Sequence, residues 1–248
     1  MSALVVLGVV VAFVVGAGLQ RIAGMGLGLV AAPSLSLMLG PVAGVTMSNL
    51  GAIVAAALIL GAMRAHVDWG RFARIGPLIA VGAVAGALVV REVDPAWLDV
   101  VLGASVLLAL ALSLGLQARV RVRGTPAAVA AGVVSGFLNT TSGVAAPAMA
   151  IYALATRWDQ RSFAATLQPI FLVANTASVV AKAALGATPE PGLLPWWIWP
   201  VVVLAVLVGV GTAGLVARRV PPGRARSLAI GIALTGGVLA LGRGITNL

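Results

Sequence analysis

The chain has no cysteine, a single histidine and only six acidic residues among 248. Without cysteine it can form no disulfide, no thiol redox centre and no thiolate metal site. The six carboxylates all fall in expected loops or at the ends of apolar segments, at Asp68, Glu92, Asp94, Asp99, Asp159 and Glu190. We therefore expect no metal, no cofactor, no mid-membrane carboxylate for proton coupling, and no acid-base pair of an embedded enzyme.

Charge of either sign is scarce, because charged residues make up 9% of the chain and hydrophobic residues 61%. Soluble domains carry about 25% charged residues. Apolar runs of about 17 to 25 residues, the length that crosses a bilayer, recur from end to end. No polar block between them is long enough to fold separately. The composition predicts an all-α polytopic membrane protein with one domain, residues 1–248.

The net charge of +10 comes mostly from four short connections between the apolar runs. Arginine-rich connections of this kind are typical of cytoplasmic loops, so the charge indicates membrane topology rather than a nucleic-acid partner. The loops near Arg64, Arg121, Arg157 and Arg219 are predicted to share the cytoplasmic face. Lys182 lies near the other end of its segment, where we expect its ammonium group to reach the membrane boundary.

Two stretches interrupt the apolar pattern in a similar way. The first, Gly16 to Pro33, holds five glycines together with Gln20 and Arg21. The second, Ala131 to Pro147, ends on the same Val-Ala-Ala-Pro sequence. Paired interruptions in one hydrophobic chain predict broken or re-entrant helices and a transporter built from two repeats.

The order of segments is the same in both halves. A broken pair precedes three spans in repeat one, about 3–116, and again in repeat two, about 125–245, which gives about ten helical segments. Each half crosses the membrane an odd number of times, so the repeats are inverted. Inverted repeats place a substrate site near the bilayer midplane, where the halves meet, and favour alternating access.

The chain resembles the sulfite exporter TauE/SafE family of bacterial membrane transporters. The resemblance runs from about Val5 to Gly242 and rests on Gly24, Gly26 and Gly28 leading to Pro33, and on Ser142 and Gly143 leading to Pro147. It implies the bacterial inner membrane and transport of a small sulfur-containing or organic anion, such as sulfite, a sulfonate or a sulfoacetate-like compound. The second half departs from the pattern, because Asn139, Thr140 and Thr141 stand where the first half has glycines.

An anion in a low-dielectric site needs donors, and helix N-termini supply them through free N–H groups and the helix dipole. Glycines allow the backbone to approach a ligand, and hydroxyls can cap a helix or donate to the ligand. The predicted substrate-binding residues are Gln20, Arg21, Gly24, Gly26, Gly28, Ser48, Asn49, Asn139, Thr140, Thr141, Ser142, Gly143, Gln168 and Asn175. Three prolines are predicted to kink or gate helices: Pro33, Pro147 and Pro169.

Each of these residues also has a structural interpretation. The glycines can serve close helix packing, and the amides can act as hydrogen-bonding contacts between helices. Arg21 either contacts the anion or lies in a boundary turn with its head group in water. Pro169 can be a static kink. The sequence leaves these alternatives open.

The preferred function is secondary transport of a small anion, with the lipid bilayer as the environment and a homodimer as an open question. An anion channel is the main alternative, and an embedded enzyme is less favoured because the acid-base groups are missing. Currents at single-channel rates would distinguish a channel from slow, saturable exchange, and chemical change of the compound would reveal an enzyme.

Overall fold

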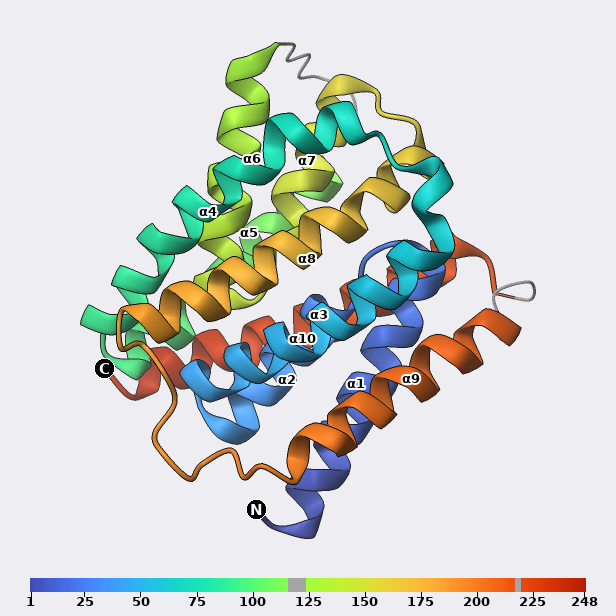
Figure 1. Cartoon of the computed structure of the whole chain (residues 1–248). Helices are drawn as coiled ribbons and strands as arrows, with labels where there is room; N and C mark the ends of the chain where they lie inside the picture. The colour runs from blue at the N-terminus through green and yellow to red at the C-terminus, as the bar shows by residue number, and fades with distance from the viewer. Residues whose placement is uncertain (116–123, 217–219) are drawn as a thin grey trace.

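The computed structural model describes residues 1–115, 124–216 and 220–248, and the regular structure within these ranges is helical (Figure 1). The helices are α1 (Ala3–Ala23), α2 (Leu27–Leu39), α3 (Pro41–Met63), the short 3-10 turn η1 (Arg64–His66), α4 (Trp69–Glu92), α5 (Pro95–Gly115), α6 (Thr125–Ser142), α7 (Ala146–Thr156), α8 (Gln160–Ala184), α9 (Ile198–Val216) and α10 (Pro222–Thr246). The ten α-helices confirm the predicted helical class.

Within the described ranges, six helices have the length and apolar composition needed to cross a membrane: α1, α3, α4, α8, α9 and α10. Helices α2 and α7 are shorter, with 13 and 11 residues. This arrangement confirms a multi-pass membrane protein. Five arginines used to predict the loop orientation, Arg119, Arg121, Arg123, Arg218 and Arg219, lie outside the described residues.

Local chemistry explains where several helices begin and end. Asp68 caps α4 by accepting a 2.9 Å hydrogen bond from Arg71 N, and Asp159 caps α8 in the same way from Ser162 N, also at 2.9 Å. Both α1 and α6 end on a left-handed glycine, Gly24 with φ 81° and Gly143 with φ 73°. A side chain at either position would be strained, so the two chain breaks depend on glycine.

The two halves follow one register through their first three helices. Gly24 and Gly143, which cap α1 and α6, are 119 positions apart. The same separation holds between the first residues of α2 and α7, Leu27 and Ala146, and between those of α3 and α8, Pro41 and Gln160. Position for position, Gln20 therefore corresponds to Asn139, and Asn49 to Gln168.

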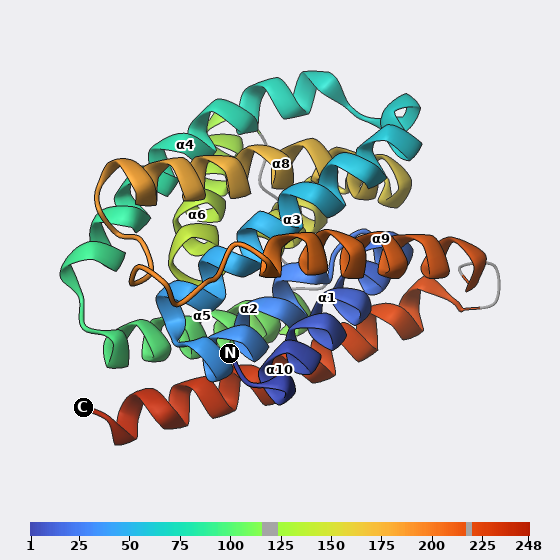
Figure 2. The same cartoon turned by 60° about the horizontal axis from the view of Figure 1, so that its bottom comes forward.

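The central pair of helices is α3 and α8, which lie side by side in both views (Figures 1 and 2). Asn49 contacts Ser178, whereas Asp68, just beyond α3, contacts Thr166, so the two helices run in opposite directions. Helix α3 of the first half and its counterpart α8 of the second half therefore run in opposite directions.

Close glycine contacts join the remaining helices across the two halves. In α4 and α6, a Cβ at Gly82 would overlap the carbonyl oxygen of Val133, and in α1 and α9, a Cβ at Gly209 would lie 3.0 Å from the Cα of Val14. The last helices of each half, α5 and α10, meet at Gly103. Small residues allow this approach of helix backbones in a membrane, so many of the glycines serve packing.

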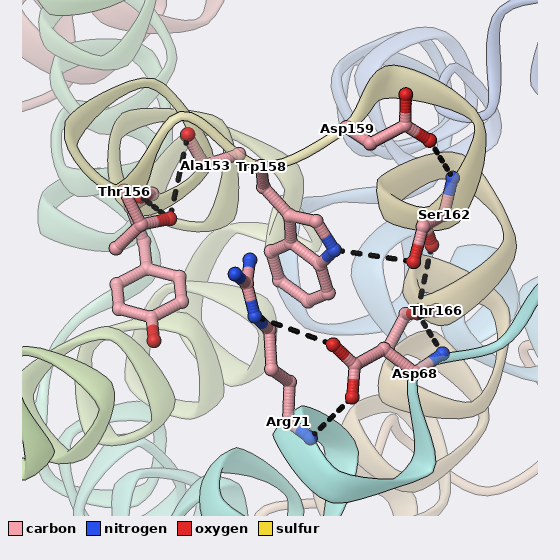
Figure 3. Close-up of polar contacts among 9 residues, drawn as sticks. Asp68, Arg71, Ala153, Thr156, Trp158, Asp159, Ser162 and Thr166 are labelled. Carbon is pink, nitrogen blue, oxygen red and sulfur yellow. Dashed lines mark hydrogen bonds and ion pairs between the residues drawn. The ribbon is translucent and has the colours of Figure 1, made fainter.

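One end of the molecule is tied by a cluster around Arg71 (Figure 3). Its guanidinium carbon lies 4.5 Å from the ring centroid of Trp158, and its Nε lies 3.3 Å from Oδ2 of Asp68. Asp68 N donates to the Thr166 hydroxyl at 2.9 Å. These contacts place the loop after α3 and the loop before α8 at the same end. We call it the Arg71 end, and the end that carries Glu92 the Glu92 end.

The structure corrects two expectations about the breaks. Asn139 and the three residues after it form the last turn of α6 rather than the break, which begins at Gly143. The shared Val-Ala-Ala-Pro does not align the prolines, because Pro147 lies in the first turn of α7, whereas Pro33 lies inside α2. At the common register, Pro147 corresponds to Gly28.

Candidate functional site

The two chain breaks touch each other inside the protein. A Cβ at Gly28, in the first turn of α2, would overlap the carbonyl oxygen of Gly143. A Cβ at Gly143 would in turn meet the side chain of Ala32, and Gly143 lies near Val45 of α3. Contacts this close require glycine on both sides, so the sequence brings the starts of α2 and α7 to one place.

A small cavity lies between the breaks. Its volume is about 20 Å³, close to the space that one water molecule needs. Both breaks, α3 and α8 contribute its lining residues: Gln20, Gly26, Gly28, Leu29, Ala52, Asn139, Gly143, Val144, Ala145, Ala146, Phe171 and Asn175. We call this space the central cavity.

Two pairs of side-chain amides hold the breaks against α8. Gln20 Nε2 donates to Gln168 Oε1 at 3.1 Å, and Gln168 Nε2 donates to the carbonyl of Gly24 at 3.1 Å. Asn139 Nδ2 donates to Asn175 Oδ1, also at 3.1 Å. All four amide side chains are buried, with 0 to 3% of their surface exposed. Each break is therefore fixed to the same central helix through amide hydrogen bonds.

The helices that start at the cavity have no side-chain cap. The residue before α2 is Gly26 and the residue before α7 is Ala145, and neither accepts a hydrogen bond from its helix through a side chain. The first N–H groups of a helix have no partner within that helix. The described part of the cavity wall thus carries two sets of backbone donors and the positive ends of two helix dipoles.

Three hydroxyls predicted at the second tip do not face the start of α7. Thr140, Thr141 and Ser142 each donate to a carbonyl four positions earlier in α6, at 2.9, 3.0 and 2.7 Å. This bonding satisfies the hydroxyls within their own helix. Of the two roles expected for these hydroxyls, capping of α7 was wrong, because the left-handed turn comes one residue after them, at Gly143. Donation to a ligand stays a prediction.

The other predicted residues are divided between the cavity and its surroundings. Six line it: Gln20, Gly26, Gly28, Asn139, Gly143 and Asn175. Arg21 is half-buried beside Gln20 and is not part of this lining. Ser48 is buried, with no hydrogen-bond partner for its hydroxyl among the described residues. Asn49 donates to Ser178 at 2.6 Å.

The three prolines have distinct surroundings. Pro33 packs in α2 under Gly236 of α10, and Pro169 lies inside α8 next to Gln168. Pro147 lines a second cavity of about 20 Å³, which reaches Arg226 of α10. Leu29 lines both cavities, so the two cavities share one residue of α2.

Sequence reasoning missed the cavity's apolar wall and two buried charged residues. Ala52 and Phe171 both line the cavity and correspond at the repeat register, which is a signal that an alignment of the two halves could have found. Asp99 is 3% exposed and paired with Arg243. Lys182 is 1% exposed, so the expectation that its ammonium group reaches the boundary was wrong.

Comparison with known proteins gives one match. A family model described as "Sulfite exporter TauE/SafE" matches residues 8–240. No curated protein and no solved structure matches the chain. The matched range spans both breaks and eight of the ten α-helices, α2 to α9, from end to end, and it covers most of α1 and α10.

Proposed function

Because the chain belongs to the sulfite exporter TauE/SafE family, we propose that it is a secondary transporter for a small sulfur-containing or organic anion. Sulfite, sulfonates and sulfoacetate-like compounds are the substrate class. The observation that carries the proposal is the meeting of two uncapped helix starts at one amide-lined cavity. The bacterial inner membrane is the proposed location, with the Arg71 end in the cytoplasm because of its arginines.

The cavity wall has the chemistry that an oxyanion requires. Backbone N–H groups and dipoles of α2 and α7 favour negative charge, and their strength rises where water is excluded. The amides of Gln20 and Asn139 add donors that can turn toward a ligand. None of the six acidic residues of the chain lines this cavity, so an anion there meets no opposing carboxylate.

The size of the cavity supports a cycle with separate open and closed states. A volume of about 20 Å³ accommodates about one water, whereas sulfite has four heavy atoms. The breaks must therefore move apart for substrate to enter. Gly28 and Gly143, in direct contact, are the residues that have to separate.

The repeat register supports alternating access. At that register, the Gln20–Gln168 hydrogen bond corresponds to one between Asn139 and Asn49. In this state Asn139 bonds Asn175 instead, and Asn49 bonds Ser178. We propose that the opposite state pairs Asn139 with Asn49 and releases Gln20 from Gln168. Exchange of the two pairings would open the cavity first to one side and then to the other.

The membrane potential supplies a driving force for export. Moving one negative charge outward gains about 2.3 kcal/mol per 100 mV when the inside is negative. Export of a monovalent anion therefore needs no carboxylate for proton coupling. We propose uniport-like export as the direction that this potential favours.

The test is sulfite efflux from proteoliposomes. Replacement of Asn139 by leucine removes a buried amide pair, a change of about 1–3 kcal/mol, so we expect efflux to fall about tenfold or more. The matched control is Gln160→Leu, which removes an exposed amide at the start of α8 and should leave efflux unchanged. Equal efflux for both variants, or no sulfite movement by the parent protein, would contradict the proposal.

Arg21 has its own test. If its guanidinium contacts the anion in an open state, Arg21→Gln should weaken sulfite-induced thermal stabilisation while the unliganded protein melts as before. Arg21 is half-buried in the last turn of α1. Unchanged stabilisation would assign it to the boundary turn instead.

A further inference from the structure

Lys182 is a buried cation that the proposed site does not use. Its side chain is 1% exposed near the end of α8, and its Nζ has no hydrogen-bond partner in the described part of the chain. A lysine inside a membrane protein is costly and persists where it has a role. A buried charge is normally paired, so the missing partner is the feature to explain.

Two contacts between α3 and α8 locate Lys182. Asn49 Nδ2 donates to Ser178 Oγ at 2.6 Å, and Lys182 lies one helical turn beyond Ser178. Further along, Val42 packs against the cluster that contains Ala187. Because the two helices are antiparallel, this register places Thr46 at the level of Lys182, between these two contacts.

The neighbours of Lys182 also have unsatisfied polar atoms. Oγ1 of Thr46 and Oδ1 of Asn49 are buried and lack hydrogen-bond partners within the residues that the structure describes. By the register above, these two atoms and Nζ of Lys182 fall within about two turns of two facing helices, and all three are buried. The hydroxyl of Ser48 is also unsatisfied among the described residues, but Ser48 does not belong to this group. It lies on the face of α3 that carries Gly44 and Gly51, which pack against α2 and α1.

These groups can bind an anion. The Lys182 ammonium offers three N–H donors and the Thr46 hydroxyl one more. If the Asn49 amide turns by 180°, the Ser178 hydroxyl donates to Oδ1 and Nδ2 becomes a further donor; the two amide orientations fit the same position. A cation is disfavoured by the ammonium group, and a water molecule would leave the charge unbalanced.

We propose that Lys182, Thr46 and Asn49 form a second anion-binding site, toward the Glu92 end of the central cavity. Asn175, Ser178 and Lys182 recur at spacings of three and four along one buried face of α8, and Asn175 lines the central cavity. Seven residues of helix place the second site roughly 10 Å further along. The inference rests on the proposed function: an anion leaving the central cavity toward this end passes to Lys182.

The test measures sulfite binding rather than transport. Purified protein in detergent, in a gluconate buffer, is melted at increasing sulfite concentration, since a ligand that binds the folded state raises the melting temperature. The background is Asn139→Leu, which disables the central cavity and leaves the second site. In this background we expect Lys182→Met to weaken the apparent sulfite affinity at least tenfold and Lys182→Arg to retain it.

The controls separate this site from its alternatives. Arg91→Gln removes an exposed cation at the same end, 52% exposed, and should not change sulfite affinity. Lys182→Met removes an unpaired buried charge, so the unliganded variant should fold and melt no lower than its parent. Equal sulfite affinity with and without Lys182, or no stabilisation of Asn139→Leu by sulfite, would overturn the second site.

Failure of the proposed function gives a different result. Lys182-dependent stabilisation without sulfite efflux from the parent protein would reject transport and keep the anion site. If the parent protein exports sulfite and Asn139→Leu exports less, transport is supported. If sulfite affinity is also unchanged when Lys182 is replaced, the second site is rejected.

Discussion

Replacing Gly28 with valine is expected to abolish sulfite efflux. A Cβ at this position would overlap the carbonyl oxygen of Gly143. The obstructing atom belongs to the backbone of the second break and cannot turn away as a flexible side chain would. Overpacking of this kind costs about 1–3 kcal/mol or more, and about 2.7 kcal/mol corresponds to a hundredfold change in an equilibrium constant. We expect at least that loss in transport rate.

The measurement is efflux from proteoliposomes with matched amounts of folded protein. Gly61→Val is the control, because Gly61 lies in α3 and a Cβ there meets nothing within 4 Å. Gly28→Ala should fall between the parent and the valine variant. If Gly28→Val exported sulfite at the rate of Gly61→Val, the contact between the breaks would have no part in transport.

Arg243→Gln is expected to cause the largest loss of folding stability, about 3–5 kcal/mol. The Arg243 guanidinium binds both carboxylate oxygens of Asp99, each at 2.7 Å, and donates to the carbonyls of Ser36 and Leu37 at 2.8 and 2.9 Å. It thereby joins α10 and α5 to the end of α2. Its loss leaves Asp99, whose side chain is 5% exposed, as an unpaired buried charge.

Unfolding of the purified protein in denaturant provides the measurement. Arg91→Gln breaks the exposed Arg91–Glu92 pair, with 52% and 65% of the side chains exposed, and should cost less than about 1 kcal/mol. The double variant Arg243→Gln/Asp99→Asn should recover part of the stability, because the orphaned charge is gone. If Arg243→Gln and Arg91→Gln lowered the free energy of unfolding equally, the buried Arg243–Asp99 pair would contribute no more stability than the exposed pair.

Local chemistry in the sequence was enough to predict most of the fold. The apolar runs predicted the membrane helices, and the glycines predicted both breaks. The end of α6 was misjudged because Asn139 to Ser142 are polar and read as a loop. Inside a membrane such hydroxyls return to carbonyls of the previous turn, and α6 continues until Gly143 adopts φ 73°.

The partners within the candidate site could not be predicted in the same way. Gln20 and Gln168 are 148 positions apart, and Asn139 and Asn175 are 36 apart on helices that meet only through tertiary packing. The sequence identified these four amides as polar residues in apolar segments, without their pairing. Lys182 was misplaced for the same reason, because its burial comes from tertiary packing of other helices around α8.

The water-sized cavity between the breaks also bears on the electrical insulation of the membrane. Room for about one molecule does not hold a continuous file of water along which protons could hop. If this cavity is the transport path, as proposed, it is too small in this state to carry protons across the membrane. We expect a variant that enlarges this cavity, such as Leu29→Ala, to leak protons and so to dissipate the proton gradient.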